Sequence, residues 1–339
     1  MGEYQMRIEA YVLNTLPIAQ RWHLTSIANQ CRYFSNHGIR FNVVDKRHHL
    51  IRQTQKYCER WVNFPLMRKV YRVYDFLESG ADYGIFMDLD KLILHPERHP
   101  SESIDLNTNY LEIINYYKNP KCQEVVDVAW RQHDPKTNNR MIAPLFDKVD
   151  FCNLLAGGEA WSWPSVCGGF YAFTREMAEF IVSRWSDMGI NPTTTAGIER
   201  LTELNHEVNR LSQLSIAGDR SGGFVDGQEK FFVVTKEGYT PNGIHDEHLL
   251  CSAFMDDSGE SVDRLTFNIN GMILTHALSH RDLLNCTWDI VEDHNAGWGS
   301  WQRTSLCEEK IARSPALFLH LIGAQAKKNA HLYEKYKVC

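Results

Sequence analysis

Long apolar runs are missing from this chain: no stretch within its 339 residues is long enough to cross a membrane as a helix. The start, residues 1–7, also lacks the basic patch followed by an apolar core that marks a secretion signal. We therefore expect a protein without a membrane span that is located in the cytoplasm.

Runs of basic residues are missing as well. The chain has 42 acidic and 36 basic residues, and no block of five or more basic residues occurs. Proteins that hold a nucleic acid or an anionic membrane through charge concentrate lysine and arginine in such blocks. A nucleic-acid partner is therefore not expected, and the partner is predicted to be a small molecule or another protein.

Paired cysteines are a third absence. The nine cysteines are scattered, odd in number and without any Cys-x-x-Cys pair. Zinc modules depend on closely spaced ligand pairs, and disulfide frameworks depend on an even count. The pattern therefore favours free thiols in a reducing compartment.

Strand and helix patterns alternate along the first 90 residues. Gly38 and Gly80 are the predicted helix stops. The predicted strands are 7–12, 40–45 and 83–87, and the predicted helices are 19–37 and 64–79. This order predicts an α/β fold with a mixed, mainly parallel central sheet flanked by helices, whose ligands gather outside the carboxyl ends of the strands.

The rest of the chain gives fewer elements. Residues 168–173 predict a strand that enters a helix over 177–185, with Thr174 as its N-cap. Two consecutive glycines at 168 and 169 indicate that something approaches the backbone closely. Segment 100–160 mixes polar residues with prolines and is interpreted as an insertion or lid. Segment 191–243 is weakly periodic and is interpreted as a variable loop or insertion.

The most informative motif is Asp88-Leu89-Asp90, directly after the apolar stretch 83–87. It puts two carboxylates where a buried strand reaches solvent. Carboxylate oxygens are suitable ligands for hard cations such as Mn²⁺ and Mg²⁺. The same pair is also typical of strand-end caps and solvated turns, so a metal site needs support from elsewhere in the chain.

That support comes from the last apolar strand, 316–319. His320 follows this strand, Gly323 lies in the turn after it, and Lys327 and Lys328 come just beyond. A strand-end histidine can complete a carboxylate metal site, while a glycine turn and a lysine suit a phosphate group. Taken singly, His320 is typical of a core histidine and Lys327 of a surface charge.

In these two motifs the chain resembles the nucleotide-sugar-dependent glycosyltransferases of the GT-A fold, most closely the retaining family-eight type. Those proteins carry an Asp-x-Asp at a strand end and a His-x-x-Gly-x-x-Lys turn near the C-terminus. Asp88, Asp90, His320 and Gly323 match, while the lysine is displaced by one position and the usual Pro-Trp after it is absent. The resemblance implies that the two aspartates and the histidine bind Mn²⁺ or Mg²⁺, and that Gly323 and Lys327 contact the diphosphate.

Two short elements between these motifs extend the resemblance. Gly168 and Gly169 resemble the small-residue strand beside the donor sugar. The segment 245–250 resembles an acidic segment that opens a helix near the donor and acceptor sugars. Asp246 and Glu247 are therefore the candidate catalytic residues.

Basic residues before the metal strand and polar residues after the first strand complete the implied site. In such enzymes a basic residue on the helix before the metal strand contacts the nucleotide or diphosphate. The matching residues here are Arg68, Lys69 and Arg72. The stretches 11–14 and 38–41 also resemble the opening of family-twenty-five glycosyltransferases, which implies that Asn14 and Thr15 touch the base or ribose.

Together these resemblances predict one GT-A-like domain over 1–339. Its expected parts are a nucleotide-binding half at 1–99, an insertion or lid at 100–160 and an acceptor-side half at 161–339. The implied activity is metal-dependent transfer of a sugar from a nucleotide-diphosphate sugar, expected to be a UDP-sugar, to a glycan or protein hydroxyl with retention. An inverting reaction would instead require Asp246 or Glu247 as the base.

Two other classes stay open. Residues 85–90 also resemble the first motif of haloacid-dehalogenase-type phosphatases, with Asp88 as nucleophile and Asp256 and Asp257 as a late acidic pair, although Lys91 replaces the usual glycine. The third class is a non-catalytic glycan-binding protein, because tryptophans can stack on sugar faces. The candidates are Trp130, Trp161, Trp163, Trp185, Trp288, Trp298 and Trp301.

Overall fold

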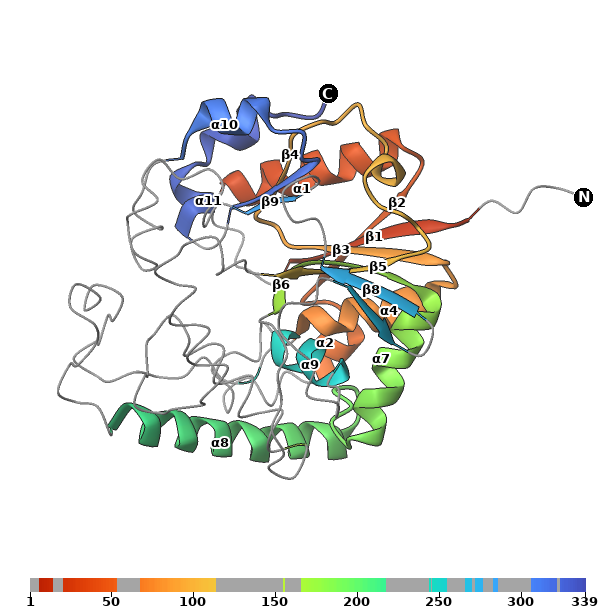
Figure 1. Ribbon diagram of the computed structural model, residues 1–339, viewed down its shortest axis with the longest axis vertical. Coiled ribbons are helices and arrows are strands. Elements are labelled where there is room, and N and C mark those ends of the chain that lie inside the picture. Colours follow the sequence, from red (N-terminus) through yellow and green to blue (C-terminus); the bar gives the residue numbers. More distant parts are fainter. Residues whose placement is uncertain are drawn as a thin grey trace, which may run out of the picture.

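A mixed sheet runs through the middle of the molecule (Figure 1). The computed structural model describes residues 6–14, 21–53, 68–113, 155, 166–217, 244, 246–254, 266–269, 272–276, 283–285, 306–321 and 324–339. Within these ranges the central sheet has seven strands in the order β2-β1-β3-β6-β5-β8-β7. The strands are β1 (Ile8–Asn14), β2 (Arg40–Asp45), β3 (Tyr83–Met87), β5 (Asn109–Ile113), β6 (Val166–Thr174), β7 (Thr266–Ile269) and β8 (Met272–His276).

Most strands of this sheet share one direction. β1 is parallel to β2 and β3, and β5 is parallel to β8. β6 is antiparallel to both of its neighbours, β3 and β5, and β7 is antiparallel to β8. Five of the seven strands therefore run the same way, which confirms the predicted α/β class with a mixed, mainly parallel sheet.

A second, three-stranded sheet brings the C-terminal strand to the Asp-x-Asp segment. Its order is β4 (Lys91–Ile93), β10 (Phe318–His320), β9 (Leu283–Asn285). β10 is antiparallel to β4, and His320 stands opposite Lys91 in this pairing. Two stretches that lie far apart in the sequence are therefore fixed side by side by backbone hydrogen bonds.

Helices cover both faces of the central sheet (Figure 1). One layer contains α1 (Arg21–Asn36), α10 (Glu308–Arg313), α11 (Ala324–Lys328) and α12 (His331–Lys335). The other contains α2 (His49–Gln53), α4 (Tyr71–Ser79), α7 (Arg175–Asp187) and α9 (Asp246–Ala253). Alternate residues of β3 face the two layers, since Ile85 packs in the core beside α1 and Phe86 in the core beside α4 and α7.

The first β-α-β unit and the helix before β3 are confirmed. β1, α1, β2, α4 and β3 all fall within or close to their predicted ranges. Gly38 and Gly80 have φ angles of 70° and 73°, a backbone region that glycine enters without steric cost, and each follows the helix it ends.

In two polar segments the described residues form elements that the sequence analysis did not predict. Helix α8 (Thr195–Ala217) occupies much of the expected loop 191–243, because Ile198, Leu201 and Leu204 recur at helical spacing and are buried. The expected insertion or lid at 100–160 contributes β5 to the interior of the sheet. The buried Glu112 interrupts the apolar pattern of that strand, which hid it in the sequence.

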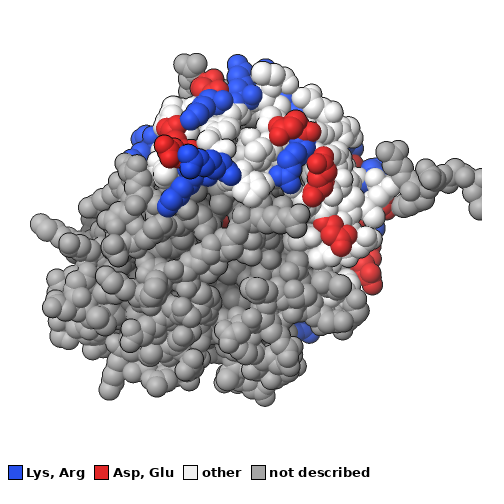
Figure 2. Space-filling view, turned by 45° about the horizontal axis from the view of Figure 1, so that its top comes forward, with Lys and Arg blue, Asp and Glu red and all other residues white. Residues whose placement is uncertain are grey.

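Charged side chains and four cysteines can be placed on the described part of the structure. Over the described part of the face in Figure 2, basic and acidic side chains are interspersed, without a patch of one sign. Cys31, Cys251, Cys307 and Cys339 are free thiols. None of the described helices combines the length and apolarity that crossing a membrane would require.

Thr174 is the N-cap of α7, as predicted. Its Oγ1 accepts a hydrogen bond of 3.2 Å from the backbone N–H of Met177. Changing Thr174→Ala is expected to lower the free energy of unfolding by about 0.5–2 kcal/mol in urea denaturation, because an N-terminal N–H loses its acceptor. Thr202→Ala is the control, since the Thr202 hydroxyl only donates to Ile198 O within α8. Equal losses for the two variants would contradict the capping role.

Candidate metal centre

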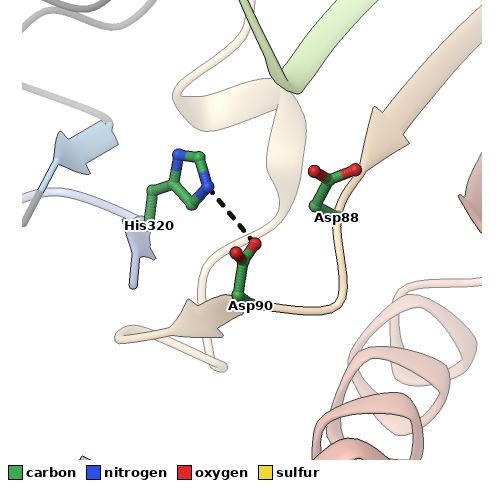
Figure 3. Close-up of side chains that lie close together, drawn as sticks. All are labelled: Asp88, Asp90 and His320. Carbon is green, nitrogen blue, oxygen red and sulfur yellow. Dashed lines mark ion pairs between the residues drawn. The ribbon is translucent and has the colours of Figure 1, made fainter. Parts of the chain in front are cut away.

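Three side chains that could hold a metal ion converge at one edge of the sheet. Asp88 follows β3, Asp90 precedes β4 and His320 ends β10. Their ligand atoms all lie within 4.8 Å of one another, and Figure 3 shows the three side chains pointing into the same space. His320 therefore lies close to both aspartates, as the sequence analysis expected.

The contact between His320 and Asp90 favours a cation. His320 Nε2 lies 3.2 Å from Asp90 Oδ1 (Figure 3), and this buried oxygen has no hydrogen-bond partner among the described residues. Burial by itself raises the pKa of Asp90, but the interactions with His320 and the positive charges of Lys91 and Lys69 together outweigh burial and lower the pKa to about 2. Asp90 therefore stays ionised at neutral pH, as a metal ligand must.

Asp88 forms an ion pair with a lysine. Its Oδ2 lies 2.5 Å from Lys69 Nζ, which is also 3.8 Å from Asp246 Oδ2. Burial raises the pKa of Asp88, although the positive charges of Lys69 and Arg72 oppose this shift. Lys69 itself has a raised pKa, because Asp246 and Asp88 overcome the opposite effect of its burial. Lys69 is thus a fixed positive charge at the end of β3.

Arg72 is a buried residue that contacts the backbone and side chains around Asp88. Its side chain is fully buried, and its guanidinium donates to Met87 O at 2.6 Å and to the Tyr171 hydroxyl at 3.0 Å. Asp88 Oδ1 is a further 3.5 Å neighbour. Arg72, predicted to contact the nucleotide, therefore occupies a buried position beneath Asp88. Arg68 is buried as well, with 5% of its surface exposed.

Helix α1 holds the backbone of the Asp-x-Asp turn. Ser26 Oγ donates to Leu89 O, and Gln30 Nε2 donates to Asp88 O at 3.0 Å. Ser26 and Gln30 lie one helical turn apart on the buried face of α1. Sequence reasoning missed both residues, because the buried face of α1 also carries the polar His23 and Asn29 and gives no clear signal for any one of them.

The two glycines of β6 make room for the site, as predicted. Leu111 pairs with Tyr171 whereas Glu112 pairs with Cys167, so the register shifts across Gly168 and Gly169. A Cβ at Gly168 would overlap the carboxylate of Asp246, and one at Gly169 would overlap His320 and Glu112. The groups that approach the backbone are therefore side chains of the site itself.

The acidic segment begins helix α9, as predicted. Asp246 is the first residue of α9 and is 1% exposed. Glu247 accepts a 3.0 Å hydrogen bond from the backbone N–H of Gly168. Both carboxylates lie at the same end of β6 as the three candidate metal ligands, while their catalytic role stays a prediction.

Glu112 is a further site residue that the sequence analysis missed. Its Oε1 lies 2.7 Å from His320 Nδ1, and its Oε2 lies 2.6 Å from Lys91 Nζ. A single glutamate within an unrecognised strand gives no sequence signal. Only the tertiary structure, which places β5 of the central sheet beside β10 of the small sheet, brings it to the histidine.

The remaining candidates are less closely tied to the centre. Asn14 is the last residue of β1, and Lys327 is exposed on α11. Thr15 and Gly323 lie outside the described residues, as do Asp256, Asp257 and the tryptophan candidates other than Trp185. Trp185 is fully buried and its Nε1 donates to Leu249 O, so it is a core residue and cannot stack on a sugar.

The fold and ligand set define a candidate divalent-cation site at the carboxyl ends of parallel strands. No protein-family model matches the chain, and no curated protein matches it. One similar solved structure is the "crystal structure of a glycosyltransferase involved in the glycosylation of the major capsid of PBCV-1". The match covers 97% of this chain and 99% of that one, with 9% sequence identity and a TM-score of 0.41. Similarity at this level leaves the function to be inferred from the residues of the site.

Proposed function

We propose that the protein is a metal-dependent glycosyltransferase, which transfers a sugar from a nucleotide-diphosphate sugar, a UDP-sugar, to a hydroxyl of a glycan or protein. The observation that carries the proposal is the convergence of Asp88, Asp90 and His320 within 4.8 Å. Two carboxylates and one imidazole suit Mn²⁺ or Mg²⁺, and they leave coordination positions open for phosphate oxygens.

The ligand atoms of Asp90 and His320 are arranged in a way that suits a divalent cation. Asp90 Oδ1 and His320 Nε2 face each other at 3.2 Å, and the oxygen is buried without a hydrogen bond in the described structure. A bound cation supplies positive charge against a leaving diphosphate. Lys69, held between Asp88 and Asp246, adds a second positive charge at the same sheet edge.

The surroundings of the acidic pair support retention of configuration. Asp246 is buried beside the ammonium of Lys69, and Glu247 is bound to the Gly168 backbone. An inverting reaction needs a carboxylate within hydrogen-bond reach of the acceptor hydroxyl. A retaining reaction can pass that proton to the leaving phosphate, so it makes no such demand on these two residues.

The two alternative classes have weaker support. In the phosphatase interpretation Asp88 is a nucleophile on a first strand, yet β1, α1 and β2 precede β3, and Lys69 engages Asp88 Oδ2. A histidine ligand is also unnecessary for that chemistry. The glycan-binding interpretation is weakened because Trp185, one of its candidate residues, is buried in the core.

Nucleotide-sugar hydrolysis with and without metal tests the proposal. A panel of nucleotide sugars is incubated with the protein and Mn²⁺, with Mg²⁺ or with EDTA, and nucleotide release is measured. We expect release with Mn²⁺, loss of at least about tenfold with EDTA, and recovery when the metal is restored. His320→Gln should lose the metal-dependent part, while His331→Gln, which changes an exposed histidine paired with Glu308, should not.

Two outcomes would overturn the proposal. A phosphoenzyme that forms on wild-type protein and disappears in Asp88→Asn would identify the phosphatase. Glycan binding without hydrolysis of any nucleotide sugar, in the presence of Mn²⁺, would identify the binding protein.

A further inference from the structure

We propose that Glu112, together with Lys91, is a positioning residue that determines which ring nitrogen of His320 faces Asp90. This inference rests on the proposed metal site and adds to it a residue that is not itself a ligand. The geometry points to a chain of contacts in which Lys91 orients Glu112, Glu112 orients His320, and His320 presents Nε2 to the cation position.

The chain of contacts is short and buried throughout. Lys91 Nζ lies 2.6 Å from Glu112 Oε2, and His320 Nδ1 lies 2.7 Å from Glu112 Oε1. The side chains of Lys91, Glu112 and His320 are 0%, 2% and 3% exposed. Water therefore cannot easily reach these side chains and replace either contact.

The chemistry of the donors decides the orientation. A lysine ammonium can only donate hydrogen bonds, so it takes Glu112 Oε2 as acceptor. Glu112 Oε1 then accepts from His320 Nδ1, which must carry a proton. The nitrogen left to face Asp90 is Nε2. In metal sites, a carboxylate that accepts from one ring nitrogen fixes the tautomer in which the other nitrogen binds the metal.

The fold places Glu112 for this contact in two ways. The register shifts between Leu111 and Glu112, where β5 advances by one residue and β6 by four, and such strand irregularities are common beside functional sites. Gly169 leaves the space that His320 and Glu112 occupy, because a Cβ there would overlap the imidazole ring. The central sheet supplies Glu112, and the small sheet supplies Lys91 and His320.

Stability alone is a weak explanation for the Lys91 and Glu112 pair. Burying two opposite charges gives up their hydration, and replacing such pairs with apolar residues of similar size is often neutral or stabilising. A role in orienting His320 gives the pair a function that two apolar side chains could not supply.

The single change Glu112→Gln tests the mechanism because it is expected to change which ring nitrogen of His320 carries the proton. The ammonium of Lys91 attracts the oxygen of the introduced amide, so the amide NH₂ turns towards His320 Nδ1. The ring then loses its Nδ1 proton, and Nε2 carries a proton towards Asp90. We expect Mn²⁺ affinity, measured by titration calorimetry and electron paramagnetic resonance, to fall by about 10- to 100-fold.

Removing the lysine from that variant should reverse the effect. In Glu112→Gln/Lys91→Met the amide oxygen is free to accept from His320 Nδ1, and we expect Mn²⁺ affinity to return to within about threefold of the wild type. Glu112→Leu/Lys91→Met has the same charge balance without an acceptor and should remain about 10- to 100-fold weaker. This comparison between two double variants still decides the question if the single variant does not fold.

¹⁵N NMR of labelled histidine shows directly which ring nitrogen of His320 is protonated. We expect His320 Nδ1 to be protonated in the wild type and in Glu112→Gln/Lys91→Met, and unprotonated in Glu112→Gln. Glu9→Gln is the matched control, since Glu9 is equally buried in the central sheet but contacts Arg7, Tyr11 and Asn42. It should change unfolding stability without changing Mn²⁺ affinity or the His320 signal.

The inference is overturned if Glu112→Gln keeps its Nδ1 proton or wild-type Mn²⁺ affinity. It is also overturned if both double variants bind Mn²⁺ equally. The NMR readout is made on metal-free protein, so it separates this inference from the proposed function. A wild type that fails to bind Mn²⁺ contradicts the proposed metal centre, whereas the state of His320 Nδ1 still tests Glu112.

Discussion

Asp90→Asn is expected to remove most of the metal-dependent activity. The substitution keeps the shape of the side chain but removes its charge, and it can place an amide NH₂ where an oxygen faces His320 Nε2 at 3.2 Å. Losing a cation ligand of this kind is expected to remove about 3–4 kcal/mol of transition-state stabilisation, or about 10²- to 10³-fold in rate. The measurement is Mn²⁺-dependent nucleotide release together with Mn²⁺ affinity.

Two comparisons make this result specific to Asp90. Asp88→Asn should reduce Mn²⁺ affinity less than Asp90→Asn, because Lys69 already engages Asp88 Oδ2 at 2.5 Å. Asp105→Asn should leave Mn²⁺ affinity unchanged, because Asp105 is an exposed turn residue that accepts from the Asn107 backbone. Equal losses for Asp90→Asn and Asp105→Asn would contradict a metal centre at Asp90.

Gly169→Ala is expected to have the second large effect. The added Cβ would overlap the His320 ring and approach Glu112 Oε2 to 2.9 Å. Both neighbours are buried and hydrogen-bonded to each other, so neither can move without breaking their 2.7 Å contact. We expect unfolding stability to fall by about 1–3 kcal/mol in urea denaturation, and Mn²⁺ affinity to fall by about tenfold or more.

Gly84→Ala is the matched control for this change. A Cβ at Gly84 would crowd the rings of Phe86 and Phe76 within the core, away from the metal ligands. It is expected to lower stability by a similar amount while leaving Mn²⁺ affinity unchanged. If both variants lose metal affinity in proportion to their stability, Gly169 has no specific role at the site.

Local patterns were sufficient for a large part of the fold. The strand β3, the helix stops at Gly38 and Gly80, and the N-cap at Thr174 each depend on a few neighbouring residues. Buried strands, αL glycines and capping hydroxyls act over single turns, so their signals are present in the sequence itself. The Asp-x-Asp pair belongs to this group, because it follows β3 directly.

Other parts were not readable because their cause lies in distant residues. β5 contains the charged Glu112, which is acceptable inside a sheet only because Lys91 and His320 meet it there. The polar α8 is held by a few buried residues such as Leu201, which find their partners in the core shared with α4 and α7. Tertiary contacts override weak local preference in both cases.

The sequence by itself determined the alternation of strands and helices and the three candidate ligands, two aspartates and a histidine, since side-chain periodicity and residue chemistry are local properties. Only the tertiary structure decided that His320 meets Asp90, that Lys69 engages Asp88 and that Glu112 stands behind the histidine. The physical reason is that these contacts join residues of different elements, which come together through the pairing of β10 with β4 and the burial of the whole core and not through any one segment.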